Sequence, residues 1–379
     1  MSARRADYFR LALTGEDSAA FVEVYRSLRF STHCRIAVIS DRSPDPAAPW
    51  VTWADIADEH AAHAIRQQAD LVMSVTDGEC AADPPPPGPA LADQWPAIPA
   101  RIHEALARAG KNLDAALESA CVLADIAAPP GYLRLDFFRT RGGETKFIGA
   151  SGSPDRSVWV PLAHGVEPGL HAELHRALAQ VRFGGSMSCE IRRQRAGDYT
   201  VVGFDRACHH WSAYRAVGVN IPLLYIQDYL QRRFDIFHFV DPGHLTVVDN
   251  AALRYRFELK HVFVDLDETL IIDNRRVDYV TTFLERCAAA GIRVSIISRH
   301  EHDIPATLSR AGIEAGLFEN IHAVAPGTKK STCVSNPDGA IFIDNEFAER
   351  LDVRRCTGIP VLDTNQLDFL VVNADAGGA

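Results

Sequence analysis

The sequence predicts an α/β protein whose C-terminal third is a doubly wound parallel sheet, preceded by an α+β region. Three observations lead to this fold class. Strand and helix patterns alternate from residue 256 onward, and two of the apolar strands there end in an acid. Between residues 131 and 205, strand patterns are joined by glycine-containing turns, which is typical of antiparallel pairs. Hydrophobic residues make up 47% of the chain, enough for a full core.

On these patterns the chain of 379 residues divides into three domains. Residues 1–90 form a small α/β region, residues 91–255 an α+β domain, and residues 256–379 the doubly wound domain. The segment Asp83–Pro89 contains four consecutive prolines. Because a proline run cannot continue a helix or a central strand, we expect a stiff loop near the first boundary.

The first domain alternates helix and strand patterns. Residues 19–29 and 54–68 carry apolar residues at helical spacing, whereas residues 35–40 and 70–75 are short apolar runs that are typical of buried strands. Alternation of this kind favours an α/β arrangement over separate layers of helices and strands.

The second domain combines helices with two antiparallel strand pairs. Gly142-Gly143 lies between two strand patterns and Gly197-Asp198 lies between two more, so each dipeptide is expected to be a turn. The expected helices are 98–125, 170–182 and 221–232, and the expected strands are 132–139, 145–150, 186–192 and 199–204.

The third domain has the clearest pattern. Apolar strands are expected at 261–265, 292–297 and 340–344, and a helix is expected at 278–290. A repeating strand–helix order implies a parallel sheet, and reactive groups in such sheets lie at the carboxyl ends of the strands.

Composition excludes several classes of function. The formal net charge of −10 argues against nucleic acid as a partner. The eight cysteines are scattered without a C-x-x-C pair, so neither a zinc site nor a disulfide framework is expected. Isolated cysteines of this kind are typical of a reducing compartment, so we expect a cytoplasmic location. The first residues lack the apolar core that a signal peptide would have, and the sequence has no run of about 18 apolar residues, so we expect no membrane partner.

Polar residues of distinct types follow the predicted strands of the third domain. Asp265 and Asp267 come at the end of the first strand, and Ser298 follows the second. The pair Lys329-Lys330 comes next, and Asp344 ends the last strand. In residue type, order and position at strand ends, these features resemble the haloacid dehalogenase (HAD) superfamily of phosphotransferases.

This resemblance covers about residues 257–370 and implies a Mg²⁺-dependent phosphohydrolase domain. A phosphate ester is negatively charged, so a carboxylate that attacks it needs a cation to reduce the repulsion. Asp265 would be the nucleophile and form an aspartyl-phosphate, and Asp267 would protonate the leaving oxygen and then activate water. Mg²⁺ would bind the carboxylates of Asp265 and Asp344 and the backbone carbonyl of Asp267.

The other residues of the resemblance would bind the phosphoryl group. Ser298 would donate a hydrogen bond to its oxygens, and a lysine would neutralise its charge. Lys330 is the first choice because it lies nearest to the start of the following helix, and Lys329 is the second. The sequence departs from the family at Asn345, where a second acid is common, and Glu346 is expected to be an exposed acid at a helix start.

The spacing of these features limits how the site is covered. About 30 residues separate Asp265 from Ser298, and about 30 separate Ser298 from Lys330. The large cap domain that HAD enzymes for small metabolites often insert does not fit into these gaps. Either the substrate is large and the site open, or the N-terminal region serves as the lid. We favour the lid, because catalysis benefits when water is excluded.

Residues 132–232 resemble the C-terminal half of an ATP-grasp domain in the order of their strands and helices, which makes ATP a candidate ligand. Glu190 matches the family's first metal-binding acid. Gly203 stands where the family has Glu, and Asp205 stands where it has Asn. We therefore expect a degenerate ATP-grasp-like domain that binds substrate or acts as a lid, and we interpret Cys208-His209-His210 as surface polar residues.

The predicted function is a Mg²⁺-dependent phosphatase that acts on a small phosphorylated molecule in a biosynthetic pathway. Two alternatives stay open at this point. The first is an ATP-grasp ligase that activates a carboxylate with ATP, against which Gly203 counts. The second is a binding protein that has lost catalysis, against which the intact Asp265 and Asp267 count.

Overall fold

The structure is a computed structural model. It describes residues 9–16, 18–29, 31, 34–42, 51–76, 79–82, 131–153, 156, 159–162, 184–195, 198–205, 211–248 and 252–370. The predictions that lie outside these residues are the loop at 83–89, the helices at 98–125 and 170–182, and the interpretation of Cys208-His209-His210; Gly197 of the second predicted turn is also outside them.

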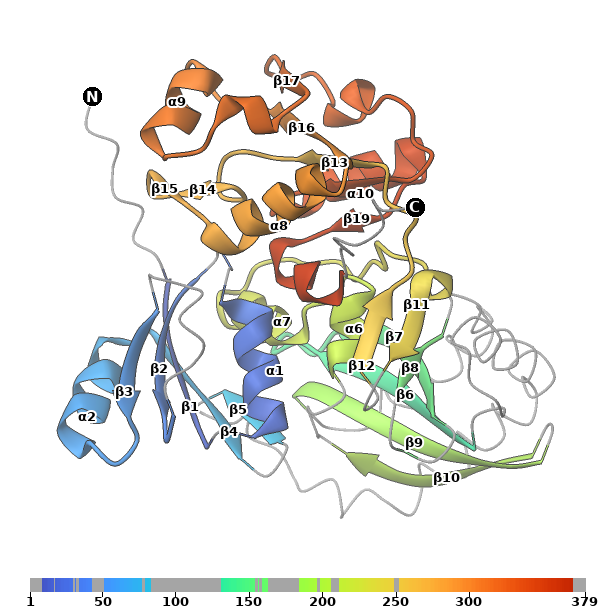
Figure 1. The fold of residues 1–379 in the computed structure, drawn as a ribbon. Helices are drawn as coiled ribbons and strands as arrows, with labels where there is room; N and C mark the ends of the chain where they lie inside the picture. The colour runs from blue at the N-terminus through green and yellow to red at the C-terminus, as the bar shows by residue number, and fades with distance from the viewer. Residues whose placement is uncertain are drawn as a thin grey trace. The chain divides into compact units, whose positions relative to one another are not determined.

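The chain has a mixed α/β fold with parallel and antiparallel sheets, divided into two compact units (Figure 1). Unit 1 comprises Met1–Leu28, Cys34–Pro44 and Thr52–Arg254, and unit 2 comprises Arg29–His33, Asp45–Val51 and Tyr255–Ala379. The predicted three-domain division at residues 90 and 255 stays a prediction.

Unit 1 begins with a five-stranded sheet in the order β3-β2-β1-β4-β5, in which only β5 is antiparallel to its neighbour. Its central strand carries five consecutive buried residues, as expected of a strand covered on both faces. The strands are β1 (Phe9–Gly15), β2 (Cys34–Ser40), β3 (Thr52–Asp55), β4 (Leu71–Thr76) and β5 (Glu79–Ala82), and the helices are α1 (Ala19–Leu28) and α2 (Glu59–Gln68).

The predicted helix at 54–68 is wrong in its first turn. Residues 52–55 form β3, which pairs in parallel with β2, and α2 starts only at Glu59. Asp58 sets this start, because its Oδ1 accepts a hydrogen bond from the Ala61 backbone N–H at 3.0 Å. An aspartate at this capping position satisfies one of the free N–H groups of the first turn.

The second sheet of unit 1 is antiparallel, in the order β10-β9-β6-β7-β8. The predicted strand pairs are confirmed, and so is the helix predicted at 221–232, which ends at Tyr229. The strands are β6 (Tyr132–Arg139), β7 (Thr145–Ser153), β8 (Val160–Pro161), β9 (Gly185–Arg195) and β10 (Asp198–Asp205), followed by α6 (Trp211–Ala216), α7 (Ile221–Tyr229) and the strand pair β11 (Leu245–Val248) and β12 (Ala252–Tyr255).

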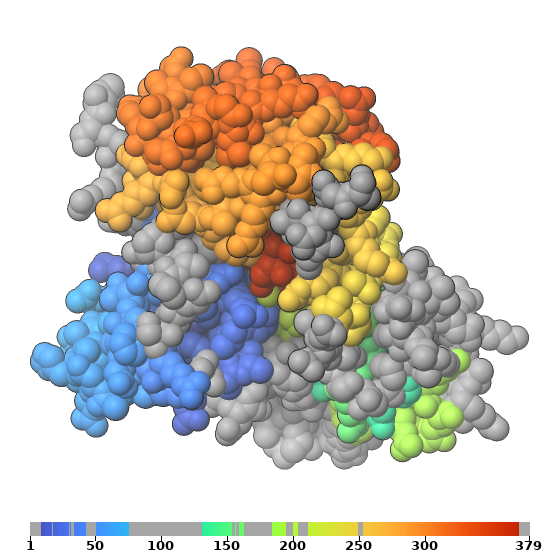
Figure 2. Space-filling view, viewed as in Figure 1, coloured from blue at the N-terminus to red at the C-terminus, as the bar shows by residue number. Residues whose placement is uncertain are grey.

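Unit 2 contains a five-stranded sheet in which all pairs are parallel, in the order β17-β16-β13-β18-β19. Residues 261–370, orange to red, form one continuous body in the space-filling view (Figure 2). The strands are β13 (His261–Val264), β16 (Arg293–Ser298), β17 (Asn320–Ala323), β18 (Ala340–Ile343) and β19 (Val361–Leu362), with the hairpin β14 (Ile271–Ile272) and β15 (Arg275–Arg276), and the helices are α8 (Asp278–Ala289), α9 (Ile304–Arg310) and α10 (Phe347–Thr357).

The strand order of unit 2 determines where a site can form. The chain runs from β13 outward through β16 to β17, and then returns to the other side of β13 for β18 and β19. Where the direction across a parallel sheet reverses, the loops after the strands diverge and leave a crevice at the carboxyl ends. The ends of β13 and β18 therefore lie at the place where charged side chains can meet.

Candidate functional site

Two acids lie side by side at the carboxyl end of the unit 2 sheet. Parallel pairing sets Val264 of β13 opposite Ile343 of β18, so the residues that follow them, Asp265 and Asp344, are neighbours. The Asp265 backbone N–H donates to the Ile343 carbonyl at 2.9 Å. The predicted juxtaposition of the two strand-end acids is therefore present in the structure.

A single lysine joins the two acids. Lys330 is the first residue of a short 3-10 helix, Lys330–Cys333. Its Nζ lies 2.7 Å from Asp265 Oδ1 and 2.7 Å from Asp344 Oδ2. The side chain of Lys330 is 5% exposed, that of Asp265 is 7% exposed and that of Asp344 is 0% exposed. We call Asp265, Lys330 and Asp344 the strand-end cluster.

Burial makes the charges of the strand-end cluster depend on one another. Burial raises the pKa of Asp265, although the ammonium of Lys330 acts against this shift. Burial and the nearby charge of Asp265 together raise the pKa of Asp344 to about 7. Burial alone would lower the pKa of Lys330, but the two carboxylates outweigh it and raise that pKa. Loss of any one charge would therefore change the ionisation of the other two.

Neighbouring residues hold the cluster in place. Arg350 of α10 donates to the backbone carbonyls of Asp344 at 2.6 Å and Asn345 at 2.8 Å. The Asn345 amide oxygen accepts a hydrogen bond from the Thr269 hydroxyl at 3.1 Å, so the residue that departs from the family pattern has a structural partner. The Glu346 backbone N–H donates to Asp344 Oδ1 at 2.7 Å. Asp344 is thus fixed through its main chain and its side chain.

Asp267 contacts a residue that the sequence analysis did not identify. Its carboxylate oxygens lie 3.0 and 2.9 Å from His300 Nδ1, and its side chain is 50% exposed. His300 Nε2 lies 2.9 Å from the Thr307 hydroxyl of α9. The signal that could have identified His300 is its place two residues after the end of β16, at the same edge of the sheet as Asp265.

Ser298 and Lys329 have partners outside the strand-end cluster. Ser298 is 1% exposed, and its hydroxyl accepts a hydrogen bond from the His300 backbone N–H at 3.3 Å. Lys329 is 65% exposed and its Nζ lies 2.6 Å from Asp352 of α10. Of the two predicted lysines, the structure therefore brings only Lys330 to the acids. The catalytic roles predicted for all these residues stay predictions.

The strand-end cluster has donors suited to Mg²⁺. In the part of the chain that the structure describes, no group of three or more His, Cys, Asp or Glu side chains is arranged to hold a metal. Asp265 and Asp344 nevertheless offer two carboxylates to one point, which Lys330 Nζ contacts. Mg²⁺ commonly takes only one or two protein carboxylates and completes its octahedron with phosphate oxygens and water. The donor type therefore fits Mg²⁺, while the point between the two carboxylates is taken by the Lys330 ammonium.

The acid predicted for metal binding in unit 1 is paired with arginines. Glu190 of β9 forms an ion pair with Arg134 at 3.0 Å and another with Arg156. The sheet register sets Gly203 directly opposite Glu190, so a carboxylate at position 203 would have been its neighbour. The guanidinium groups of Arg134 and Arg156 thus neutralise Glu190, and the residue opposite Glu190 in the sheet is Gly203 rather than a second acid. The side chain of Asp205 is outside the described residues.

Comparison with known proteins gives matches among solved structures, and no family model and no curated protein matches. An L-amino acid ligase from Bacillus licheniformis is 14% identical, with a TM-score of 0.34 over 59% of this chain and 74% of its own. A biotin carboxylase from Campylobacter jejuni is 10% identical, with a TM-score of 0.38 over 60% and 72%. An N5-carboxyaminoimidazole synthetase from Staphylococcus aureus is 10% identical, with a TM-score of 0.35 over 62% and 81%.

These comparisons correct the main functional prediction. The structures named are ATP-grasp enzymes, which agrees with the resemblance seen for residues 132–232. None of them is a phosphatase, so the predicted phosphatase function is corrected: the findings agree better with the alternative, an ATP-grasp ligase. The prediction failed because acids and a lysine at strand ends indicate the position of a charged site but not its reaction. The same charged groups can take part in many reactions of phosphate compounds.

Among the described helices, none has both the length and the apolar character needed to cross a membrane.

Proposed function

We propose that this protein is an ATP-dependent ligase that activates a carboxylate by phosphoryl transfer, with the strand-end cluster as the site that binds the phosphoryl group and Mg²⁺. The observation that carries the proposal is the shared ammonium: Lys330 Nζ lies 2.7 Å from each of two buried carboxylates at the reversal point of a parallel sheet. A buried group of this kind is costly to maintain and is rarely kept for stability alone.

The proposed reaction balances as follows. An oxygen of the substrate carboxylate attacks the γ-phosphorus of ATP, the bond from that phosphorus to the bridging oxygen breaks, and ADP leaves. The resulting acyl phosphate is then attacked at its carbonyl carbon by the acceptor nucleophile, which loses a proton, and inorganic phosphate leaves. Catalysis of such transfers depends on positioning and on stabilising negative charge rather than on covalent chemistry by the protein.

The residues of the strand-end cluster have distinct tasks in this proposal. Lys330 neutralises charge on the phosphoryl oxygens. Asp265 and Asp344 would hold Mg²⁺, which when bound would screen the repulsion between nucleotide and carboxylate. The acid predicted to bind metal in unit 1, Glu190, is already paired with the buried Arg134 at 3.0 Å. This favours Asp265 and Asp344 over Glu190 as the metal-binding acids.

The test measures ADP release with Mg²⁺ and ATP against a panel of carboxylic acids, each supplied with and without a mixture of amines. A ligase should release ADP only when an acid that it accepts is present. Lys330→Gln should lower kcat/KM by about a hundredfold, the usual loss for one group that stabilises transition-state charge. The matched control is Lys329→Gln, which removes the adjacent, exposed lysine and should change kcat/KM by less than about threefold.

The outcomes separate the remaining alternatives. ADP release that depends on an acid and is lost in Lys330→Gln supports both the ligase and the site. Acid-dependent ADP release that is unchanged in Lys330→Gln keeps the ligase and rejects the strand-end cluster as its site. A folded protein that binds ATP or the acids in calorimetry, yet releases no ADP with any acid, would favour the binding protein that has lost catalysis.

A further inference from the structure

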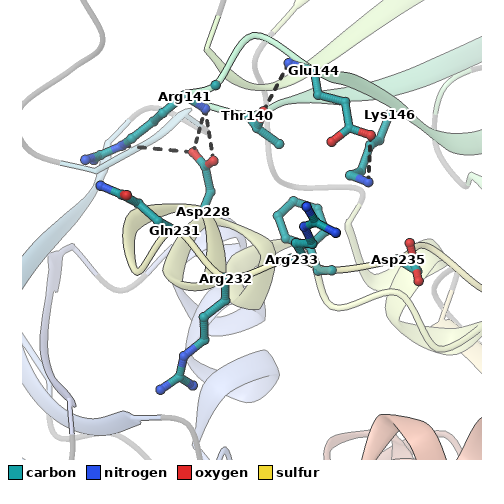
Figure 3. Close-up of a pocket in the computed structure, with 11 residues that line it drawn as sticks. Thr140, Arg141, Glu144, Lys146, Asp228, Gln231, Arg232, Arg233 and Asp235 are labelled. Carbon is teal, nitrogen blue, oxygen red and sulfur yellow. Dashed lines mark hydrogen bonds and ion pairs between the residues drawn. The ribbon is translucent and has the colours of Figure 1, made fainter.

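A second candidate site is an open cavity of about 710 Å³ in unit 1, beside the turn between β6 and β7 (Figure 3). One wall comes from this turn and from the start of β7, and the other comes from the end of α7 and the segment after it. Its volume is in the range of small-molecule sites. The proposed ligase reaction makes no use of it.

The end of α7 directs charged side chains toward the cavity. Gln231 has a positive φ of 53°, and the Arg232 backbone N–H donates to the Gln227 carbonyl at 2.8 Å, so the chain turns sharply at the helix end. Phe234 is then buried against Phe138, with ring centroids 5.5 Å apart. Because Phe234 is anchored inward, the residues on either side of it are exposed.

Most charges around the cavity are already paired. The Arg141 backbone N–H donates to Asp228 Oδ1 at 2.9 Å, and the Arg141 guanidinium lies 4.0 Å from the same carboxylate. Lys146 Nζ lies 3.0 Å from Glu144. These two pairs line opposite sides of the close-up (Figure 3) and leave no net charge between them.

Two opposite charges on the cavity wall are not paired. Arg233 and Asp235 flank Phe234, both are exposed, and neither has an ion pair or hydrogen bond among the residues that the structure describes. Arg232 also lines the cavity and is exposed, with its side chain directed to another side than those of Arg233 and Asp235 (Figure 3). Among the described residues, the cavity therefore presents available groups of both signs: the guanidinium groups of Arg232 and Arg233 and the carboxylate of Asp235.

We propose that this cavity binds a small zwitterion, a molecule with one carboxylate and one ammonium group. The carboxylate would accept paired hydrogen bonds from the Arg233 guanidinium, and the ammonium would donate to Asp235. A dianion would also meet the acids of the lining, Glu144, Asp228 and Asp235, and a dication would also meet its basic residues, Arg141, Lys146, Arg232 and Arg233. A zwitterion is the ligand class whose charges complement available groups of both signs.

The experiment is calorimetry of the full chain, without ATP, against a series of ω-amino acids: glycine, β-alanine, 4-aminobutyrate and 6-aminohexanoate. Acetate and butylamine carry one charge each, and succinate carries two negative charges. At least one amino acid should bind about tenfold more tightly than any of these three controls, since it forms both charged contacts at once. Arg233→Gln and Asp235→Asn should each weaken that binding by about fivefold or more.

The variant controls separate a site from a general charge effect. Arg275→Gln removes an exposed arginine of the β14–β15 hairpin and should leave binding within about twofold. The proposal is overturned if no amino acid binds more tightly than acetate or butylamine, if succinate binds as tightly as the best amino acid, or if Arg233→Gln and Asp235→Asn bind like the wild type. Lys330→Gln should keep this binding, so failure of the ligase proposal and failure of this one are distinguishable.

Discussion

Replacement of Lys330 by methionine should destabilise unit 2 strongly. At an effective dielectric constant of about 20, each contact of 2.7 Å between Lys330 Nζ and a carboxylate corresponds to about 6 kcal/mol of Coulomb attraction. Desolvation of the three ions offsets most of this attraction. What decides the outcome is that Asp265 and Asp344 would stay buried beside each other without a cation. Breaking a buried ion pair in this way costs about 3–5 kcal/mol.

Urea unfolding monitored by circular dichroism measures this loss, with Lys329→Met as the matched control. Lys329 is 65% exposed and pairs with Asp352 at the surface, so its replacement should cost less than about 1 kcal/mol. Adding Asp344→Asn to Lys330→Met should recover part of the loss, because it removes one of two like charges. The reasoning is refuted if Lys330→Met unfolds within about 1 kcal/mol of the wild type, or if the control loses as much.

Three further predictions concern stability. Burial lowers the pKa of His261 from 6.5 to about 4. Between these two pH values the unfolded state therefore binds a proton that the folded state does not. The free energy of unfolding should fall by about 1.4 kcal/mol per pH unit as the pH drops from 6.5 toward 4. In urea titrations at several pH values, His261→Asn should remove that slope. Gly185→Ala should cost about 2–3 kcal/mol, because the φ of +75° is strained for alanine and the new Cβ would meet the Tyr225 ring; a change in thermal midpoint of under about 2 °C would contradict this. Arg215→Met should cost about 3–5 kcal/mol by leaving Glu23 buried and unpaired, whereas Arg215→Met with Glu23→Leu should be closer to the wild type in urea unfolding.

Most strands could be predicted from local pattern, and the errors have identifiable causes. The strand pairs at 132–150 and 186–204 combine period-two alternation with glycine turns, and the structure forms both. The central strand β1, Phe9–Gly15, was not identified from its local sequence pattern. Its place between β2 and β4 depends on long-range pairing, which a local pattern does not contain.

The position of the candidate site was predictable because parallel strands end at a common edge. Asp265 and Asp344 follow two apolar strands, and pairing of those strands is enough to bring the acids together. The sequence places His300 at the same edge of the sheet, but its contact with Asp267 depends on how the chain turns after β16, which the sequence pattern does not give. Nothing in the spacing along the sequence distinguishes a carboxylate that faces the cluster from one that faces a histidine.

The lysine pair shows what decides between neighbouring residues. Lys329 and Lys330 are chemically identical, and the sequence offered only proximity to a helix start as a reason to prefer the second. In the structure, Lys330 opens a 3-10 turn and is 4% exposed, while Lys329 precedes that turn and pairs with Asp352 of α10. Because consecutive residues at the start of a 3-10 turn point in different directions, the Lys330 ammonium lies at the sheet edge and the Lys329 ammonium lies at the surface.

The strand-end cluster indicates where the reaction takes place, but it does not determine which reaction that is. Two carboxylates and an ammonium at a sheet edge bind a cation and a phosphoryl group equally well whether that group is lost to water or transferred to a carboxylate. The choice between these outcomes depends on which nucleophile is held in line with phosphorus, and therefore on a second binding site. Substrates other than ATP, and the residues that hold them, will decide the reaction, which is why acid-dependent ADP release is a sharper criterion than any property of Asp265 or Lys330.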